Sequence, residues 1–113
     1  MAYFGIIMVF AETPIFTKVI KSLMSNDQYR ELQHAIIQRP DTGALIKDSG
    51  GLRKIRWKIE GKGKSGGVRI IYYSMVSKDQ IYMIYAYPKN KQENLTPEQI
   101  TALKKVVQRW HDE

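Results

Sequence analysis

The sequence contains no cysteine and only two histidines among its 113 residues. Without cysteine, the chain can form no disulfide, no Cys-ligated zinc or iron–sulfur site and no thiol nucleophile. His34 and His111 are too far apart in the chain to indicate a metal site. We therefore expect no metal and no cofactor. His34 fits a helix surface, and His111 fits the end of the last helix, where a positive charge complements the helix dipole.

Long hydrophobic runs are also lacking. The apolar start of the chain covers residues 1–11, whereas a membrane helix needs about 20 such residues. It also lacks the Lys or Arg that precedes the apolar part of a secretory signal. We therefore expect no membrane partner and a cytoplasmic location. Ile6, Ile7, Val9 and Phe10 are strand-forming residues, so this stretch is interpreted as a strand.

Length and hydrophobic patterning predict a single domain over residues 1–113. Three helices are expected because Thr13, Ser25 and Thr96 are N-cap residues, and Pro follows Thr13 and Thr96. Further along the chain, apolar residues recur at every second position, which indicates strands. The expected elements are a strand near the start, helices from residue 14 and residue 25, strands at 52–59, 68–76 and 81–87 with a turn at 77–80, and a helix from residue 97 to 110. The order β-α-α-β-β-β-α predicts an α+β fold, a small antiparallel-rich sheet with helices packed on it.

The positive charge is concentrated in one part of the chain. The sequence has 18 Lys and Arg against 11 Asp and Glu, a net charge of +7. Residues 47–69 hold eight of the basic and two of the acidic residues, and therefore +6 of that charge. Such a concentration favours an anionic partner, such as nucleic acid.

Lys54, Arg56 and Lys58 alternate with apolar residues in the strand at 52–59. Side chains at this spacing project from one face of a strand, about 6.5–7 Å apart. Phosphates along a nucleic-acid strand have a comparable separation, so this row can follow a nucleic-acid backbone. The alternative is a solvated face that keeps the sheet soluble.

Lys62 and Lys64 lie in a glycine-rich loop after this strand. The loop does not have the spacing of a nucleotide-binding P-loop, and a strand follows it where a P-loop needs a helix. A flexible basic loop beside a basic strand either binds phosphates or simply connects two strands. We expect binding.

Arg69 begins the most hydrophobic strand, and Tyr87-Pro88-Lys89-Asn90-Lys91 follows the next one. The Arg69 guanidinium either escapes to solvent along its stem or is fixed by the sheet, where it could bind a phosphate through two hydrogen bonds. Five tyrosines crowd this hairpin. Most should pack across strands, and one or two could stack on bases.

Residues 8–113 resemble a RelE/HigB-type toxin of a bacterial toxin–antitoxin system. The resemblance rests on three segments in order: the strand and helix start at residues 9–16, the segment from Gly50 through the glycine–lysine loop to Tyr73, and residues 87–91. It also makes Met8 an alternative start and residues 1–7 an extension.

The resemblance implies a fold like that of small microbial ribonucleases and a metal-independent endoribonuclease, an mRNA interferase. Such a toxin cleaves messenger RNA in the ribosomal A site by attack of the 2′-OH on the adjacent phosphate. It also implies a cognate antitoxin, which we expect to be a helix-turn-helix protein. The catalytic residues it implies are Lys54, Arg56, Arg69 and Lys89.

Lys54 is the expected base, because neighbouring cations lower the pKa of a lysine. Arg56 and Arg69 are the expected phosphate clamp. The sequence lacks the Tyr or His that some relatives carry just beyond Lys91, so Tyr87, a lysine or the ribosome could protonate the leaving group. The expected RNA-binding residues are Arg53, Lys58, Lys62, Lys64, Tyr87 and Lys91.

Two other functions fit the same basic face. The first is a non-catalytic RNA- or DNA-binding module, and the second is a structural partner of an acidic protein. A protein partner alone would leave little salt-dependent affinity for RNA.

Overall fold

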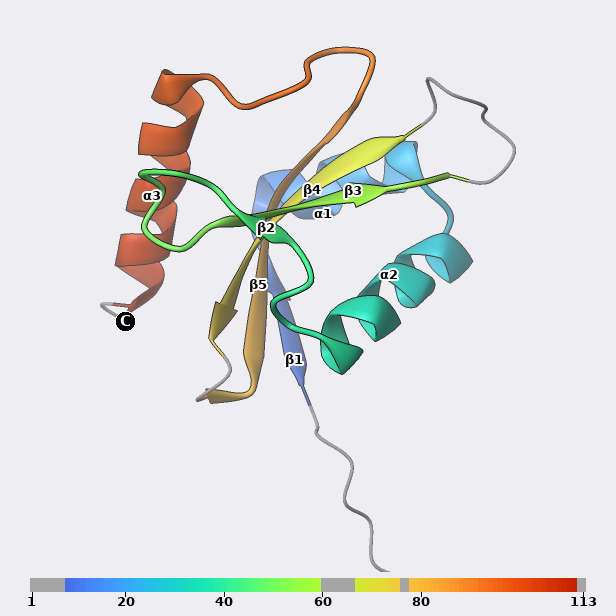
Figure 1. Cartoon of the computed structure of the whole chain (residues 1–113). Coiled ribbons are helices and arrows are strands. Elements are labelled where there is room, and N and C mark those ends of the chain that lie inside the picture. The colour runs from blue at the N-terminus through green and yellow to red at the C-terminus, as the bar shows by residue number, and fades with distance from the viewer. Residues whose placement is uncertain (1–7, 60–66, 76–77, 112–113) are drawn as a thin grey trace, which may run out of the picture.

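In the computed structural model, which describes residues 8–59, 67–75 and 78–111, five strands form one sheet and three helices pack on it (Figure 1). The strand order is β1-β5-β4-β3-β2. β1 runs parallel to β5, and the other neighbours are antiparallel. The elements are β1 (Val9–Glu12), α1 (Pro14–Leu23), α2 (Asn26–Gln38), β2 (Ala44–Leu45), β3 (Arg53–Trp57), β4 (Val68–Met75), β5 (Gln80–Pro88) and α3 (Pro97–His111).

The predicted α+β class and the order of the main elements are confirmed. β2 is an additional strand, in which Ala44 and Leu45 pair with Lys54 and Arg53. Two residues are too few to show an alternation of apolar and polar side chains, so the sequence could not predict this strand. Residues 60–66 of the predicted loop, Val76 at the end of the predicted strand, Ser77 at the start of the predicted turn and residues 1–7 lie outside the described residues.

All three helices begin at the predicted caps. The Ser25 hydroxyl accepts a hydrogen bond from the Gln28 amide, and the Gln28 side chain accepts one from the Ser25 amide. Thr96 and Gln99 make the same reciprocal pair before α3. These capping boxes satisfy backbone amides that a helix start leaves without partners.

Two hydrophobic cores form, one on each face of the sheet. The first lies between the sheet and α1 and α2, and contains Phe16, Leu32 and Tyr72. The second lies under α3 and contains Ile71, Ile84 and Val107. β3 shows the division clearly, because Ile55 belongs to the first core while Lys54 and Arg56 face the other side.

The C-terminal end of α3 packs on tyrosines of β4 and β5. The Trp110 ring lies 4.6 Å from the ring of Tyr82 and 6.1 Å from that of Tyr73, between centroids. A ring nitrogen of His111 lies 2.9 Å from the Tyr73 hydroxyl. This end of the sheet is therefore covered, as expected for packing tyrosines.

No helix in the described part of the chain is both long and apolar enough to cross a membrane.

Thr13 joins the start of α1 to an irregularity in β5. The register between β4 and β5 shifts at Ile71 and Tyr72, which leaves Ile84 without a partner in that ladder. The buried Thr13 hydroxyl donates to the Ile84 carbonyl at 2.7 Å and accepts from the Phe16 amide at 3.0 Å. One side chain thus satisfies two buried backbone groups.

We predict that Thr13→Ala lowers the free energy of unfolding by about 2–3 kcal/mol, because it removes a helix cap and leaves a buried carbonyl unpaired. Thr96→Ala is the matched control, since Thr96 caps α3 at the surface, and should cost about 1 kcal/mol. Urea denaturation measures both. Equal losses for the two variants would contradict the role given to the Ile84 contact.

Candidate functional site

A row of polar side chains crosses the three central strands. Arg56 of β3 pairs directly with Arg69 of β4, and Arg69 pairs directly with Tyr87 of β5. Directly paired residues of antiparallel strands place their side chains on the same face. Lys54 precedes Arg56 by two residues, so it lies on that face too. The register therefore brings together four residues that the sequence could only place on three separate strands.

Arg69 is the buried centre of this row. It is only 5% exposed, so its guanidinium is fixed by the sheet and does not escape to solvent. Its Nη2 lies 3.1 Å from Oε1 of Glu93. Its Nε is buried and has no hydrogen-bond partner among the described residues. A buried charged group that keeps a free donor is uncommon, and this donor has capacity for another acceptor.

Glu93 supplies the negative charge that the cationic row needs. The hydrogen bond from Arg69 is the main reason that the pKa of this carboxyl lies below its usual value, and the charges of Arg69, Lys89 and Arg56 lower it further. The carboxylate is thus ionised at neutral pH. Its side chain is half-exposed, at 53%, so it covers Arg69 from the solvent side.

Lys54 is held by Asn94 and surrounded by positive charge. Its Nζ donates to Oδ1 of Asn94 at 2.6 Å. Partial burial lowers the pKa of Lys54 below its usual value, and the positive charges of Arg56 and Arg69 lower it further. The expected direction of this shift is confirmed. Burial, which the sequence did not reveal, is its larger cause.

The segment between β5 and α3 carries Lys89 and Lys91, both exposed. The Lys89 amide donates to the Gly67 carbonyl at 2.9 Å, which ties this segment to the start of β4. The effect of Lys89 on the pKa of Glu93 places its charge near the ion pair. Lys91 lies further along, with its amide bonded to the Pro88 carbonyl.

Tyr87 closes the row on the β5 side. It is buried, and burial is the main cause that raises the pKa of its hydroxyl above the usual value. The hydroxyl lies 3.5 Å from the Glu93 carbonyl oxygen. Tyr87 therefore keeps its proton at neutral pH, but its ring is not presented as an open surface for stacking.

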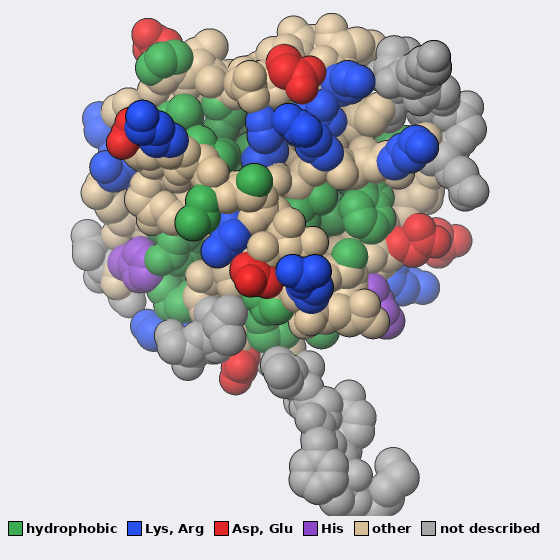
Figure 2. Space-filling view, in the orientation of Figure 1, with side chains coloured by type: hydrophobic (Ala, Val, Ile, Leu, Met, Phe, Trp, Pro, Cys, Tyr) green, Lys and Arg blue, Asp and Glu red, His purple; other side chains and the backbone are tan. Residues whose placement is uncertain are grey.

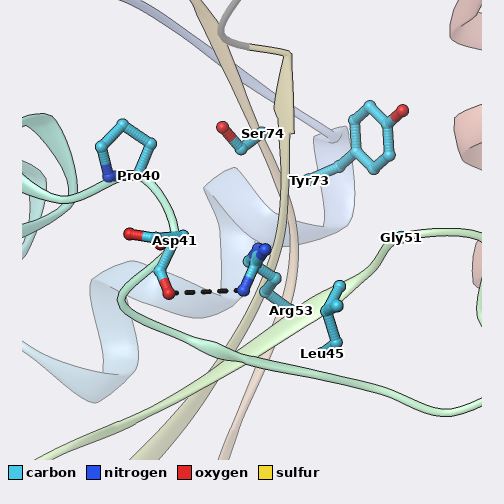
Figure 3. A pocket seen from close by; sticks show the side chains of 7 residues that line it. All are labelled: Pro40, Asp41, Leu45, Gly51, Arg53, Tyr73 and Ser74. Carbon is cyan, nitrogen blue, oxygen red and sulfur yellow. Dashed lines mark hydrogen bonds between the residues drawn. The ribbon is translucent and has the colours of Figure 1, made fainter.

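Arg53 lies apart from this row. It alternates with Lys54, so it points to the opposite face of β3, where its Nη1 donates to the carbonyl oxygens of Gly43 at 2.7 Å and Asp41 at 3.3 Å. Figure 3 shows it in a separate pocket, beside Asp41 and Leu45. The structure gives Arg53 a contact that orders the segment before β2.

Lys58 is exposed just beyond the end of β3, and Lys62 and Lys64 lie outside the described residues.

The sequence reasoning missed Glu93 and Asn94. Both lie between Lys91 and the Thr96 cap, so their place in the segment before a helix was the available signal. Leu95 is buried in the second core and anchors the segment. The Gln92 side chain donates to the Asn94 carbonyl and to the Gln99 side chain, both at 2.9 Å.

The view in Figure 2 shows Lys and Arg side chains gathered over β3, beneath the segment that follows β5. Acidic side chains lie beside them rather than among them. Within the described ranges, no three His, Asp or Glu residues lie close enough to hold a metal ion. The arrangement offers guanidinium donors to a phosphate beside a lysine whose pKa lies below its usual value.

Residues 8–112 match the family described as the RelE toxin of the RelE/RelB toxin–antitoxin system. The chain therefore belongs to the RelE toxin family and is the toxin of a toxin–antitoxin pair.

A solved structure of the E. coli toxin RelE, a variant with two arginines replaced by alanine in the free state, has a similar fold. The TM-score is 0.58 at 18% sequence identity, and the similarity covers 96% of this chain and 98% of that chain. At this identity the likeness concerns the fold alone. It agrees with the RelE-like architecture that the sequence predicts.

We predict that Arg56→Gln raises the pKa of Lys54, because removing a neighbouring positive charge favours the protonated ammonium. The shift should be upward and partial, since burial still lowers the pKa. NMR titration of the Lys54 side chain measures it. Arg30→Gln is the control, because Arg30 lies on α2, which packs on the other face of the sheet. An unchanged or lower Lys54 pKa in Arg56→Gln would contradict the account.

Proposed function

We propose that this toxin is a ribosome-dependent endoribonuclease that cleaves messenger RNA in the A site and thereby inhibits translation. The observation that carries the proposal is the buried Arg69, paired across β3 and β4 with Arg56 and retaining an unused Nε donor. Two like charges directly opposite each other destabilise a sheet. Such a local conflict is typical of a functional site, and a phosphate would relieve it.

The proposed reaction cleaves the RNA by an intramolecular transesterification at the phosphate. The 2′-oxygen of one nucleotide forms a bond to the adjacent phosphorus, and the bond from phosphorus to the 5′-oxygen of the next nucleotide breaks. The products are a cyclic 2′,3′-phosphate and a free 5′-hydroxyl. Negative charge grows on the phosphate oxygens during attack, and fixed cations stabilise that charge. Arg56 and Arg69 fill this role, with Lys89 as a further cation, so no metal ion is needed.

Lys54 is the proposed base for the 2′-hydroxyl. Its lowered pKa increases the fraction of neutral amine at physiological pH. The hydrogen bond to Asn94 holds Nζ at the edge of the cationic row. The leaving 5′-oxygen takes its proton from Tyr87, a lysine or a ribosomal group. Of these, Tyr87 is protonated and lies next to Arg69 in the row.

Glu93 must give way when the phosphate binds. A phosphate bound through Nε and Nη2 of Arg69 would compete with the Glu93 carboxylate for Nη2, and two anions so close repel each other. Because the Glu93 side chain is half-exposed, it can turn to solvent without disturbing the core. Lys58, Lys62, Lys64 and Lys91 then bind flanking phosphates in this proposal, while Arg53 orders the β2 segment.

An antitoxin partner follows from the family. We propose a helix-turn-helix protein for this role, encoded beside the toxin. The substrate also sets the proposed location, since ribosome-bound messages occur in the cytoplasm.

We predict that Arg56→Ala and Arg69→Ala each slow cleavage of ribosome-bound message about 100-fold, the usual effect of removing one donor to a developing oxyanion. Inducing the wild-type gene should arrest growth, and both variants should relieve the arrest. Primer extension on messages from translating ribosomes measures the cleavage.

Two controls keep this test decisive. Arg30→Ala removes an exposed arginine from α2 and should cleave as the wild type does. Arg69→Ala could misfold because Arg69 is buried, but Arg56 is exposed, so circular dichroism should report a folded Arg56→Ala protein. The proposal is wrong if wild-type toxin leaves ribosome-bound messages intact. Salt-dependent RNA binding without cleavage would instead support the non-catalytic module.

A further inference from the structure

Residues 92–95 contact two of the proposed catalytic side chains at once. Oε1 of Glu93 lies 3.1 Å from Nη2 of Arg69. The next residue, Asn94, accepts a hydrogen bond from Nζ of Lys54 at 2.6 Å. Neighbouring residues of one short segment therefore engage both the proposed phosphate clamp and the proposed base.

The Glu93 carboxylate resembles the phosphate that the site is proposed to bind. Both groups are anions that offer two oxygen acceptors, and a guanidinium binds either of them with the same donors. The hydrogen bond from Arg69 and the charges of Arg69, Lys89 and Arg56 hold the pKa of this carboxyl below its usual value. Glu93 is therefore an anion at neutral pH, and it lies within the positive charge that a message phosphate would use.

The residues on either side of Glu93 hold it in place. Leu95 is buried in the second core, at 8% exposure. The Gln92 side chain donates to the Asn94 carbonyl and to the Gln99 side chain, both at 2.9 Å. Because these contacts fix the segment, the carboxylate stays near the guanidinium at a high effective concentration. Only the Glu93 side chain has to turn for the ion pair to open.

The ion pair can also be displaced readily. It uses Nη2 of Arg69, while Nε has no partner among the described residues. The Glu93 side chain is 53% exposed, and exposed ion pairs add little stability. A phosphate that binds Nε and Nη2 together gains a second charge-assisted hydrogen bond, so it can replace the carboxylate.

We propose that Glu93 is an internal competitor of the message: in the free toxin its carboxylate occupies the phosphate site on Arg69, and RNA binds by displacing it. The inference rests on the proposed ribonuclease function and adds a regulation of the same site. A competitor that occupies the site about nine-tenths of the time weakens the apparent affinity about tenfold. A message held in the ribosomal A site at a high effective concentration displaces the carboxylate, whereas dilute free RNA meets a mostly occupied site.

The test is Glu93→Gln, which keeps the shape of the side chain and removes its charge. The probe is a short single-stranded RNA with a methyl group on every 2′-oxygen, which can bind but cannot be cleaved. Fluorescence anisotropy should show that Glu93→Gln binds this RNA about tenfold more tightly than the wild type, because an anion beside the phosphate is gone. On ribosome-bound message the variant should lower KM and leave kcat unchanged, since the competitor acts on the free toxin.

Asp27→Asn is the matched control. Asp27 also forms an ion pair, with Arg30 at 4.0 Å, but it lies on α2, which packs on the other face of the sheet. The substitution changes the net charge equally, so it should leave the RNA affinity within about twofold of the wild-type value. NMR adds a direct measurement: the Glu93 carboxyl signal should shift when the wild type binds the methylated RNA, while the Asp27 signal stays in place.

The inference is wrong if Glu93→Gln binds the methylated RNA no more tightly than Asp27→Asn does. Weaker binding by Glu93→Gln would also overturn it, and would give Glu93 the role of positioning Arg69 for the phosphate. If neither the wild type nor the variant binds, the phosphate site is wrong and the inference fails with it. Failure of the proposed function looks different, because Glu93→Gln would then bind RNA more tightly while the wild type cleaves no message.

Discussion

The direct pairing of Arg56 with Arg69 across β3 and β4 is the constraint on which the rest of the site depends. Sheet register places two positive charges on one face, and one of them is buried. The electrostatic cost needs a nearby anion, and Glu93 provides it from the segment before α3. Partial burial lowers the pKa of Lys54, and these same positive charges lower it further. A phosphate in place of Glu93 would bridge the pair, so a costly sheet contact becomes a binding site.

Local chemistry made much of the fold predictable. Thr13, Ser25 and Thr96 each cap a helix in the structure as the sequence predicts. The alternation of Lys54 and Arg56 with Ile55 also placed the cations on one face and the isoleucine in the core. β2 could not be predicted, because Ala44 and Leu45 form a strand only through pairing with β3.

The contacts within the site could not be predicted from the sequence, because they join residues that lie far apart in the chain. The sequence could not show that Arg69 faces Arg56 and Tyr87, since register depends on how three strands align. Glu93 and Asn94 were missed because their roles come from Arg69 and Lys54, which lie far from them in the chain. Arg53 was grouped with its basic neighbours, yet strand alternation turns it to the other face, where it binds the carbonyls of Asp41 and Gly43.

The most direct test of the central claim is whether a phosphate binds at the Arg69 Nε. NMR can follow the Nε–H signals of the arginines while a nucleoside 3′-phosphate is titrated into the wild-type toxin. The account predicts that the Arg69 signal shifts and saturates together with that of Arg56, while the signal of Arg30 on α2 stays in place. Saturable shifts of Lys54 and Arg56 with an unchanged Arg69 signal would contradict it.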